Sequence, residues 1–258
     1  MSQLIEAVII AIIQGITEWL PVSSSGHIII AERLLGHNSS LIFQVALHFG
    51  TLMSVFVYFG REITDILQDL LRLKFNTENG KLGIFLIIAT IPAALVGFFF
   101  KDVFESLFSD LTIVAIGFAI TGLILIIASF PITKHNGRLD LKKSLIIGTA
   151  QIFSIFSGIS RSGTTISTGL ILGLKEKTAL KFSFLMSIPI IFGANILTIG
   201  NQTLPKELIW ATFVSFIIGI LMLHLFYKHI LTARKNLRWF GIYALLLALI
   251  TLITIISN

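Results

Sequence analysis

Two short polar runs hold most of the side chains in this sequence that can take part in chemistry. The first run contains Gln14, Glu18, Ser23, Ser24, Ser25, Gly26 and His27, and the second contains Ser160, Arg161, Ser162, Gly163, Thr164 and Thr165. Each run interrupts a segment that is otherwise apolar. Together they supply a carboxylate, a guanidinium, an imidazole and several hydroxyls, a combination that indicates a site for an anionic group.

The second run has the composition of a phosphate-binding turn. A Ser/Gly-rich turn that opens into a helix presents free N–H groups and hydroxyls, and the helix dipole favours an anion there. The guanidinium of Arg161 can hold a phosphate through two parallel hydrogen bonds. A carboxylate such as Glu18 beside a phosphate suits a hard divalent cation, which takes oxygen ligands from both. His27 would serve as general acid or base, and an activated serine as nucleophile.

Each of these residues also has a structural interpretation. Glu18 and Arg161 would then pair only with each other, His27 would be a buried histidine bonded to backbone, and the serines would cap a helix. Gln14 and Gln151 are more simply interpreted as ties between neighbouring helices.

The composition indicates an integral membrane protein that is entirely α-helical. Of the 258 residues, 55% are hydrophobic and 12% are charged, and the mean hydropathy is +0.95; soluble domains carry about 25% charged residues. The absence of cysteine excludes disulfides, cysteine-ligated zinc and cysteine nucleophiles. Six apolar blocks are near the length of about 20 residues needed to cross a bilayer. They are Leu41–Phe59, Leu82–Phe100, Leu111–Phe130, Ala179–Ile199, Leu208–Tyr227 and Phe240–Ile256.

Three polar side chains, His48, Asn195 and His224, lie within these blocks. Interhelical hydrogen bonding is the default for each of them. We expect His48 to come nearest to the site.

The two interrupted regions are Leu4–Leu35 and Ser144–Leu174. Non-helical backbone at membrane depth must pack against protein or line a wet cavity, because lipid offers it no hydrogen-bond partner. We therefore expect two re-entrant helix–turn–helix hairpins. The alternative is an ordinary helix pair joined by a surface turn.

The two regions resemble each other at a fixed offset of 137 residues. The offset pairs Gln14 with Gln151, Ser23 with Ser160, Ser25 with Ser162, Gly26 with Gly163, and Gly36 with Gly173. We predict one membrane domain over residues 1–258, made of a first repeat at 1–131 and a second at 141–257, each a hairpin followed by three spans. Because each repeat has an odd number of spans, the second copy is inverted in the membrane relative to the first. Many transporters have this architecture, with the site at the interface between the repeats.

The positions of the basic residues predict the orientation. With the N-terminus outside, the outer side collects three Lys and Arg residues and the inner side fifteen, with Arg161 in the second hairpin. Cytoplasmic loops carry the Lys/Arg excess, so both termini face outside. The first hairpin then enters from outside and the second from the cytoplasm. The net charge of +6 is explained by topology and by contacts with anionic membrane lipids, so no nucleic acid is expected as a partner.

The two runs match a known family. The run from Gln14 to His27 resembles the first signature of the bacitracin-resistance type undecaprenyl-diphosphate phosphatases, and Gly158–Gly163 resembles their second. The segment Ala46–Leu52 and the overall length are also similar. The resemblance covers essentially the whole chain. It implies six transmembrane helices plus two re-entrant hairpins in an inverted repeat.

The resemblance also implies a reaction and roles. The reaction is hydrolysis of a polyprenyl diphosphate to the monophosphate and inorganic phosphate, at the outer face of the cytoplasmic membrane, with Mg²⁺ or Ca²⁺. By motif match Glu18 is the catalytic and metal-side carboxylate, Ser24 the nucleophile, His27 the acid/base and Arg161 the phosphate clamp; whether serine or water attacks stays open. The expected substrate-binding residues are Gln14, Ser23, Ser25, Gly26, Ser160, Ser162, Gly163 and Thr164.

Two departures from the family pattern stand out. The first signature often has Glu at the position of Gln14, so a two-carboxylate metal site is weakened here, and the second often begins with Pro at the position of Ser157.

Two other functions compete with the phosphatase. A transporter or flippase of a polyprenyl phosphate or small anion would use the same broken helices. A structural scaffold would leave the polar breaks without a role. Prenyl chain length is not specified by the sequence, and a homodimer is left open as an assembly.

Overall fold

The computed structural model describes residues 3–36, 40–131, 137–199, 206–230 and 233–257. Within these ranges the regular structure is helical, as predicted, with no strand beyond one isolated bridge between Gly137 and Leu174. The helices are α1 (Gln3–Thr17), α2 (Ser24–Leu35), α3 (Leu41–Tyr58), α4 (Gly60–Leu71), α5 (Glu78–Phe99), α6 (Lys101–Leu107), α7 (Leu111–Ser129), α8 (Leu141–Gln151), α9 (Arg161–Ile171), α10 (Glu176–Ile199), α11 (Lys206–Leu225) and α12 (Leu237–Ser257). Short 3₁₀ segments occupy Ile152–Ile155 and Arg234–Asn236, and a π turn follows α11 at Phe226–Ile230.

Six helices, α3, α5, α7, α10, α11 and α12, are long and apolar enough to cross a membrane, which confirms the six predicted spans. Their ends differ from the predicted bounds by a few residues. The helix α5 begins at Glu78 rather than Leu82, because the hydroxyl of Thr77 caps it by accepting a hydrogen bond from Gly80 N–H. A polar first helical turn of this kind lies outside the apolar block, so hydropathy alone does not assign it to the helix.

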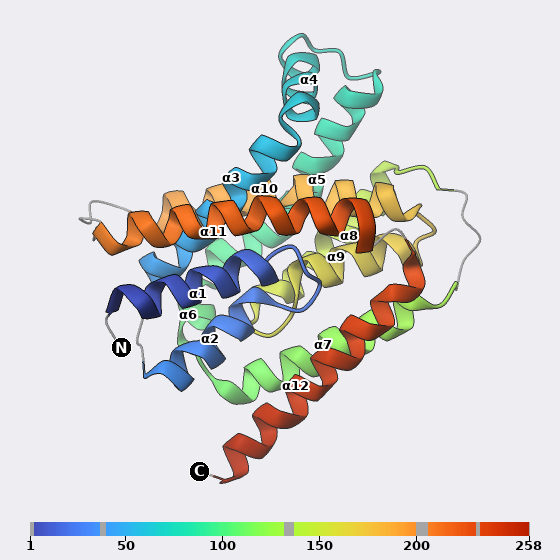
Figure 1. The fold of residues 1–258 in the computed structure, drawn as a ribbon. Coiled ribbons are helices and arrows are strands. Elements are labelled where there is room, and N and C mark those ends of the chain that lie inside the picture. The colour runs from blue at the N-terminus through green and yellow to red at the C-terminus, as the bar shows by residue number, and fades with distance from the viewer. Residues whose placement is uncertain (1–2, 37–39, 132–136, 200–205, 231–232, 258) are drawn as a thin grey trace.

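Two helices were not predicted. The helix α4 packs on the start of α5 and projects from the bundle (Figure 1), and it buries only Ile66 among its twelve residues. The short helix α6 follows α5 directly and buries none of its residues fully. Both are too polar or too short to stand out as apolar blocks.

The two interrupted regions form helix–turn–helix pairs, α1 with α2 and α8 with α9 (Figure 1). Their helices have 15, 12, 11 and 11 residues. At about 1.5 Å per residue, none reaches across the hydrocarbon core of about 30 Å. These lengths are compatible with hairpins that enter and leave on one side, and the re-entrant topology stays a prediction.

Equivalent contacts recur at the 137-residue offset. Ser23 accepts a hydrogen bond from Gly26 N–H, and Ser160 accepts one from Gly163 N–H. Gly36 and Gly173, which follow α2 and α9, both have a positive φ, 65° and 83°. The helix α1 packs on α11, and its counterpart α8 packs on α5. The turns are therefore built alike, and the inverted repeat itself stays a prediction.

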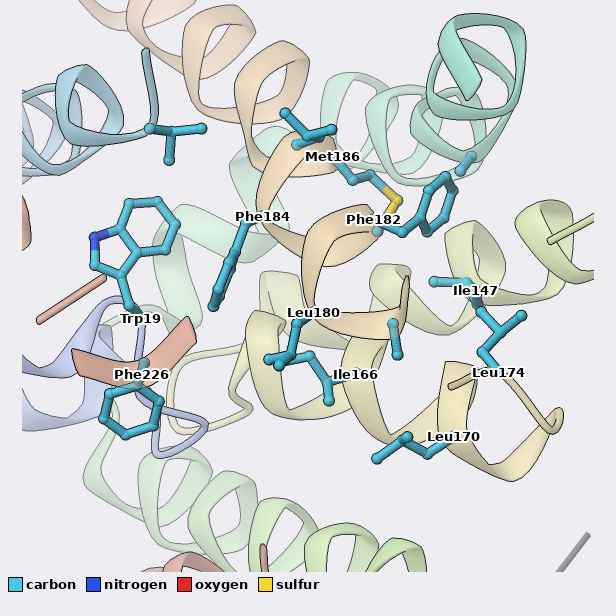
Figure 2. Close-up of a cluster of buried hydrophobic side chains, with 14 of the residues drawn as sticks. Trp19, Ile147, Ile166, Leu170, Leu174, Leu180, Phe182, Phe184, Met186 and Phe226 are labelled. Atoms are coloured by element: carbon cyan, nitrogen blue, oxygen red, sulfur yellow. The ribbon is translucent and has the colours of Figure 1, made fainter. Parts of the chain in front are cut away.

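A cluster of aromatic side chains includes Trp19, which lies in the turn between α1 and α2. This turn is called the first turn below, and the turn between α8 and α9 the second turn. Figure 2 shows Trp19 beside Phe184, with Phe182 and Met186 on the same helix, α10, and Phe226 nearby. All five side chains are 1% exposed or less. The rings of Trp19 and Phe184 meet edge to face with centroids 5.4 Å apart. Close packing of this kind holds Trp19, the residue that follows Glu18, in place through dispersion contacts.

Candidate active site

Glu18 lies just beyond the end of α1, and side chains from four helices, α1, α2, α3 and α9, meet at its carboxylate. Its Oε1 accepts a hydrogen bond from Arg161 Nη2 at 2.5 Å. Its Oε2 accepts one from Ser24 Oγ at 2.7 Å and one from Gln14 Nε2 at 3.1 Å, and His48 Nδ1 lies 3.1 Å away. The residue is 7% exposed. A buried carboxylate needs such partners, because apolar surroundings penalise an isolated charge.

Arg161 is the first residue of α9, and its side chain reaches from the second turn to Glu18 in the first turn. Besides Glu18, its guanidinium donates through Nη1 to the carbonyl oxygen of Ser183 at 3.4 Å. The guanidinium carbon lies 5.7 Å from the centre of the Trp19 ring, a distance typical of a cation–π contact. The predicted phosphate clamp is thus preorganised by α10 and by the first turn.

Ser24 opens α2 after a turn with unusual backbone geometry. Its predecessor Ser23 has φ 68°, in the left-handed region that non-glycine residues seldom occupy. The hydroxyl of Ser23 caps α2 by accepting from Gly26 N–H and lies 3.3 Å from that of Ser25. With Ser23 as the cap, Ser24 Oγ is turned to Glu18. A serine hydroxyl bonded to a carboxylate has the arrangement of a nucleophile and its base.

His27 is engaged on both ring nitrogens with other partners. Its Nδ1 lies 2.6 Å from the carbonyl oxygen of Ser23, and its Nε2 lies 2.8 Å from the hydroxyl of Tyr243 on α12. The ring stacks on Tyr243 and meets Phe118 edge-on. No hydrogen bond joins it to Glu18 or Ser24 in the described structure. The geometry supports the structural interpretation of His27, and its acid/base role stays a prediction.

The second turn is hydrogen-bonded to the first. Ser162 donates from its hydroxyl to the carbonyl oxygen of Leu20 at 3.0 Å. Ser160 Oγ caps α9 by accepting from Gly163 N–H at 3.0 Å and lies 3.2 Å from Ser162 Oγ. The hydroxyl of Thr164 is buried without a partner in the described structure. Ser162 therefore joins the two turns as well as facing the site.

A cavity of about 410 Å³ adjoins the ion pair, within the usual size range of ligand pockets. Apolar side chains of α5 and α10 form much of its wall, and Lys101 and Glu105 of α6 also line it. Of the predicted site residues, those that line the cavity are Glu18, Ser23, Ser24, Ser25, Ser160, Arg161 and Ser162. Those that do not are Gln14, Gly26, His27, Gly163 and Thr164. The cavity combines a polar group of turn residues with apolar walls, which suits an amphipathic ligand.

Comparisons with known proteins identify the family to which the chain belongs. The family model described as "Bacitracin resistance protein BacA" matches residues 7–250. The chain belongs to the BacA family. It is therefore a multi-pass membrane protein, in line with its six long apolar helices.

Relatives of this BacA family chain are similar over most of their length. A protein of Methanococcus vannielii named undecaprenyl-diphosphatase is 36% identical over 246 residues, which cover 95% of this chain and 97% of the relative. A protein of the same name from Thermosipho melanesiensis is 38% identical, with the same coverage. Another, from Caldicellulosiruptor bescii, is 43% identical over 83% of this chain and 81% of its own length.

The donor atoms around Glu18 fit a single hard divalent cation. The described residues contain no cluster of three or more His, Asp or Glu side chains that could hold a metal. They do place one carboxylate, the hydroxyl of Ser24 and the amide of Gln14 together, and the buried Oε1 of Gln14 has no hydrogen-bond partner. Oxygen donors of this kind suit Mg²⁺ or Ca²⁺ when phosphate and water complete the coordination.

Two residues that position the BacA family site escaped the sequence reasoning. Thr121 of α7 donates its hydroxyl to the carbonyl oxygen of Gly158 at 3.0 Å and accepts from Ser160 N–H at 2.9 Å. It thereby gives hydrogen-bond partners to backbone groups that have none within the broken helix. Tyr243 holds His27 from α12. The only sequence signal is a lone polar side chain in an apolar span, because nothing local specifies which way a span is rotated.

Proposed function

We propose that the protein is an undecaprenyl-diphosphatase, a membrane-embedded hydrolase that removes the terminal phosphate of a polyprenyl diphosphate. The observation that carries the proposal is the cluster of Glu18, Ser24 and Arg161, joined at 2.5–2.7 Å on the wall of an amphipathic cavity. The names of the relatives support hydrolysis rather than the transport alternative. The product would be the lipid monophosphate that serves as a carrier in cell-wall glycan synthesis.

The cluster supplies the groups for nucleophilic displacement at phosphorus. The terminal phosphoryl group takes donors from Arg161, whose planar fork matches its oxygens. Ser24 Oγ attacks phosphorus while its proton passes to Glu18 Oε2, which already accepts it at 2.7 Å. The bond from phosphorus to the bridging oxygen breaks, and the lipid monophosphate leaves with the bonding electrons. Water then hydrolyses the phosphoserine and restores the serine and inorganic phosphate.

A divalent cation, Mg²⁺ or Ca²⁺, is proposed as cofactor, with Glu18 and Gln14 as the protein side chains that would hold it. When bound, it would neutralise charge on the phosphoryl group. The apolar walls contributed by α5 and α10 are proposed to hold the prenyl chain next to the head group.

The proposed location is the cytoplasmic membrane, with both termini outside and the cavity open to the outer face. The support is the distribution of Lys and Arg, fifteen on the inner side against three on the outer. Lys101, which lines the cavity, belongs to the outer group under this topology.

Phosphate release tests the proposal directly. The full chain in detergent is incubated with undecaprenyl diphosphate and Mg²⁺, and inorganic phosphate is measured against time. The wild type is expected to release one phosphate per lipid, and Arg161→Ala to release almost none. A wild type that moves polyprenyl phosphate across proteoliposomes but releases no phosphate would support the transport alternative instead.

A further inference from the structure

Three side-chain atoms crowd together on one side of the Glu18 carboxylate. Gln14 Nε2 lies 2.9 Å from His48 Nδ1 and 3.1 Å from Glu18 Oε2, and His48 Nδ1 lies 3.1 Å from the same oxygen. The three atoms thus form a nearly equilateral triangle. Arg161 contacts the other carboxylate oxygen, Oε1, and leaves this side to the triangle.

Hydrogen bonds account for only two of the three edges of this triangle. If His48 Nδ1 carries a proton, it and Gln14 Nε2 both donate to Glu18 Oε2, and the second amide hydrogen of Gln14 goes to Thr51 Oγ1 at 3.3 Å, so the 2.9 Å edge between the two nitrogens carries no hydrogen bond. If Nδ1 instead accepts from Gln14, two lone pairs face each other across the 3.1 Å edge to Glu18 Oε2. One edge of the triangle therefore carries no hydrogen bond in either tautomer.

The Gln14 amide offers a second orientation. Its Oε1 is buried without a hydrogen-bond partner in the described structure, and a half-turn of the amide exchanges the positions of oxygen and nitrogen. The triangle then consists of an amide oxygen, a carboxylate oxygen and an imidazole nitrogen, all presenting lone pairs. Such a set of converging lone pairs is suited to hold a cation.

The size of the triangle matches a metal ion. Ligands at about 2.1 Å from an octahedral ion are about 3.0 Å apart, as expected for Mg²⁺ and for nitrogen bound to first-row metals. The observed edges are 2.9, 3.1 and 3.1 Å. Ser24 Oγ, 2.7 Å from Glu18 Oε2, lies next to the triangle. Three side chains on one face would leave the opposite face to phosphate and water.

His48 is placed to face the substrate as well. It lines the cavity, and its side chain is 26% exposed. No hydrogen bond to its Nε2 occurs among the described residues. With Nδ1 bound to a cation, the proton resides on Nε2, which can donate to a phosphoryl oxygen. His27, by contrast, uses both ring nitrogens away from this cavity.

We propose that His48 is a ligand of the catalytic divalent cation through Nδ1, forming one face of its coordination sphere with Glu18 and Gln14. This inference rests on the proposed function of the same site. One carboxylate, one amide and one imidazole suit an ion that accepts nitrogen, such as Mn²⁺, better than Ca²⁺, which prefers oxygen ligands. Mn²⁺ is therefore the cation with which an imidazole ligand is best detected.

Electron spin-echo spectroscopy of bound Mn²⁺ tests the proposal without relying on activity. The full-length protein, freed of any histidine tag, is loaded with one equivalent of Mn²⁺, unlabelled or labelled with ¹⁵N-histidine. The wild type is expected to show nitrogen modulation that changes with the label. His48→Gln is expected to lose it and to raise the Mn²⁺ Kd about tenfold or more. His224→Gln, in a histidine that lies against Tyr58, is the matched control and is expected to keep it.

Two results would overturn the proposal: a wild type with no tightly bound Mn²⁺, or bound Mn²⁺ whose spectrum does not respond to histidine labelling. The wild-type measurement decides this even if His48→Gln fails to fold. Phosphate release is measured on the same samples. Release without histidine modulation removes the role of His48 alone, whereas modulation without release removes the phosphatase proposal alone.

Discussion

Arg161 Nη2 lies 2.5 Å from Glu18 Oε1 and joins two residues that are 143 positions apart in the chain. The pair connects the end of α1 to the start of α9, so each broken helix places one charge where the other neutralises it. Breaking one partner of a buried pair costs about 3–5 kcal/mol, because the remaining charge is left without compensation. The pair is therefore a structural tie and also the electrostatic centre of the site.

Replacement of one charge at a time separates these two roles. Glu18→Gln is expected to lower kcat by about 10²–10⁴-fold, because the base for Ser24 and a proposed ligand of the cation are both lost, and also to lower the Tm. Glu18→Leu with Arg161→Met is expected to recover most of the Tm without recovering phosphate release. Recovery of activity in the double variant would contradict a catalytic role for the pair.

The serines of the first turn are expected to differ sharply. Ser24→Ala removes the hydroxyl that donates to Glu18 and should lower kcat by about 10²-fold or more with little change in KM. Ser25→Ala, one residue away, loses the contact with Ser23 Oγ and one hydroxyl of the cavity wall but no contact with Glu18, so it should keep most of the wild-type kcat. Equal effects in steady-state phosphate-release assays would remove Ser24 from the role of nucleophile.

His27 is expected to act on stability rather than on chemistry. Tyr243→Phe removes one hydrogen bond to its ring and should cost about 0.5–1.5 kcal/mol of stability with kcat nearly unchanged. His27→Gln should lower the Tm further, and the two changes together should cost less than their sum, because they remove the same contact. A His27→Gln protein with normal thermal stability and no activity would instead support the acid/base role.

The close approach of α7 to the second turn predicts a steric effect. A Cβ on Gly117 would lie 2.5 Å from the carbonyl oxygen of Ser157, so Gly117→Ala should displace the turn that carries Arg161. We expect a loss of about 1–3 kcal/mol of stability, as for other overpacked sites, together with weaker substrate binding. Gly60→Ala is the control, because nothing lies within 4 Å of a Cβ there. Thermal unfolding in detergent that shows no difference between the two variants would contradict the packing.

Because the chain has no cysteine, its orientation can be tested with single introduced cysteines. In intact cells, Ser109→Cys between α6 and α7 should react with a membrane-impermeant maleimide, and Asn76→Cys between α4 and α5 should react only after the cells are opened. The opposite pattern would reverse the proposed topology.

Sequence reasoning identified the spans and the polar turns because both follow from local composition. Apolar blocks of membrane length predicted α3, α5, α7, α10, α11 and α12. The polar breaks predicted that Glu18 and Arg161 come together in one site, since a charge within the membrane must be paired or bind something. What the sequence left open depends on how each helix is rotated about its axis. His48 lies at Glu18, as expected, but which of its ring nitrogens faces the carboxylate could not be predicted, nor that His27 faces Tyr243, because both depend on packing between distant helices.

The central claim is that the two turns meet and build one site, and an engineered disulfide tests it most directly. Ser162 donates to the carbonyl oxygen of Leu20, so cysteines at these two positions should form a disulfide when membranes are oxidised. Formation requires the two Cα atoms to come within about 7 Å. We expect rapid intramolecular cross-linking of the Leu20→Cys, Ser162→Cys protein and none of a Leu20→Cys, Ser257→Cys control. Failure of the first pair to cross-link in folded protein would mean that the turns do not meet, and the account would be contradicted.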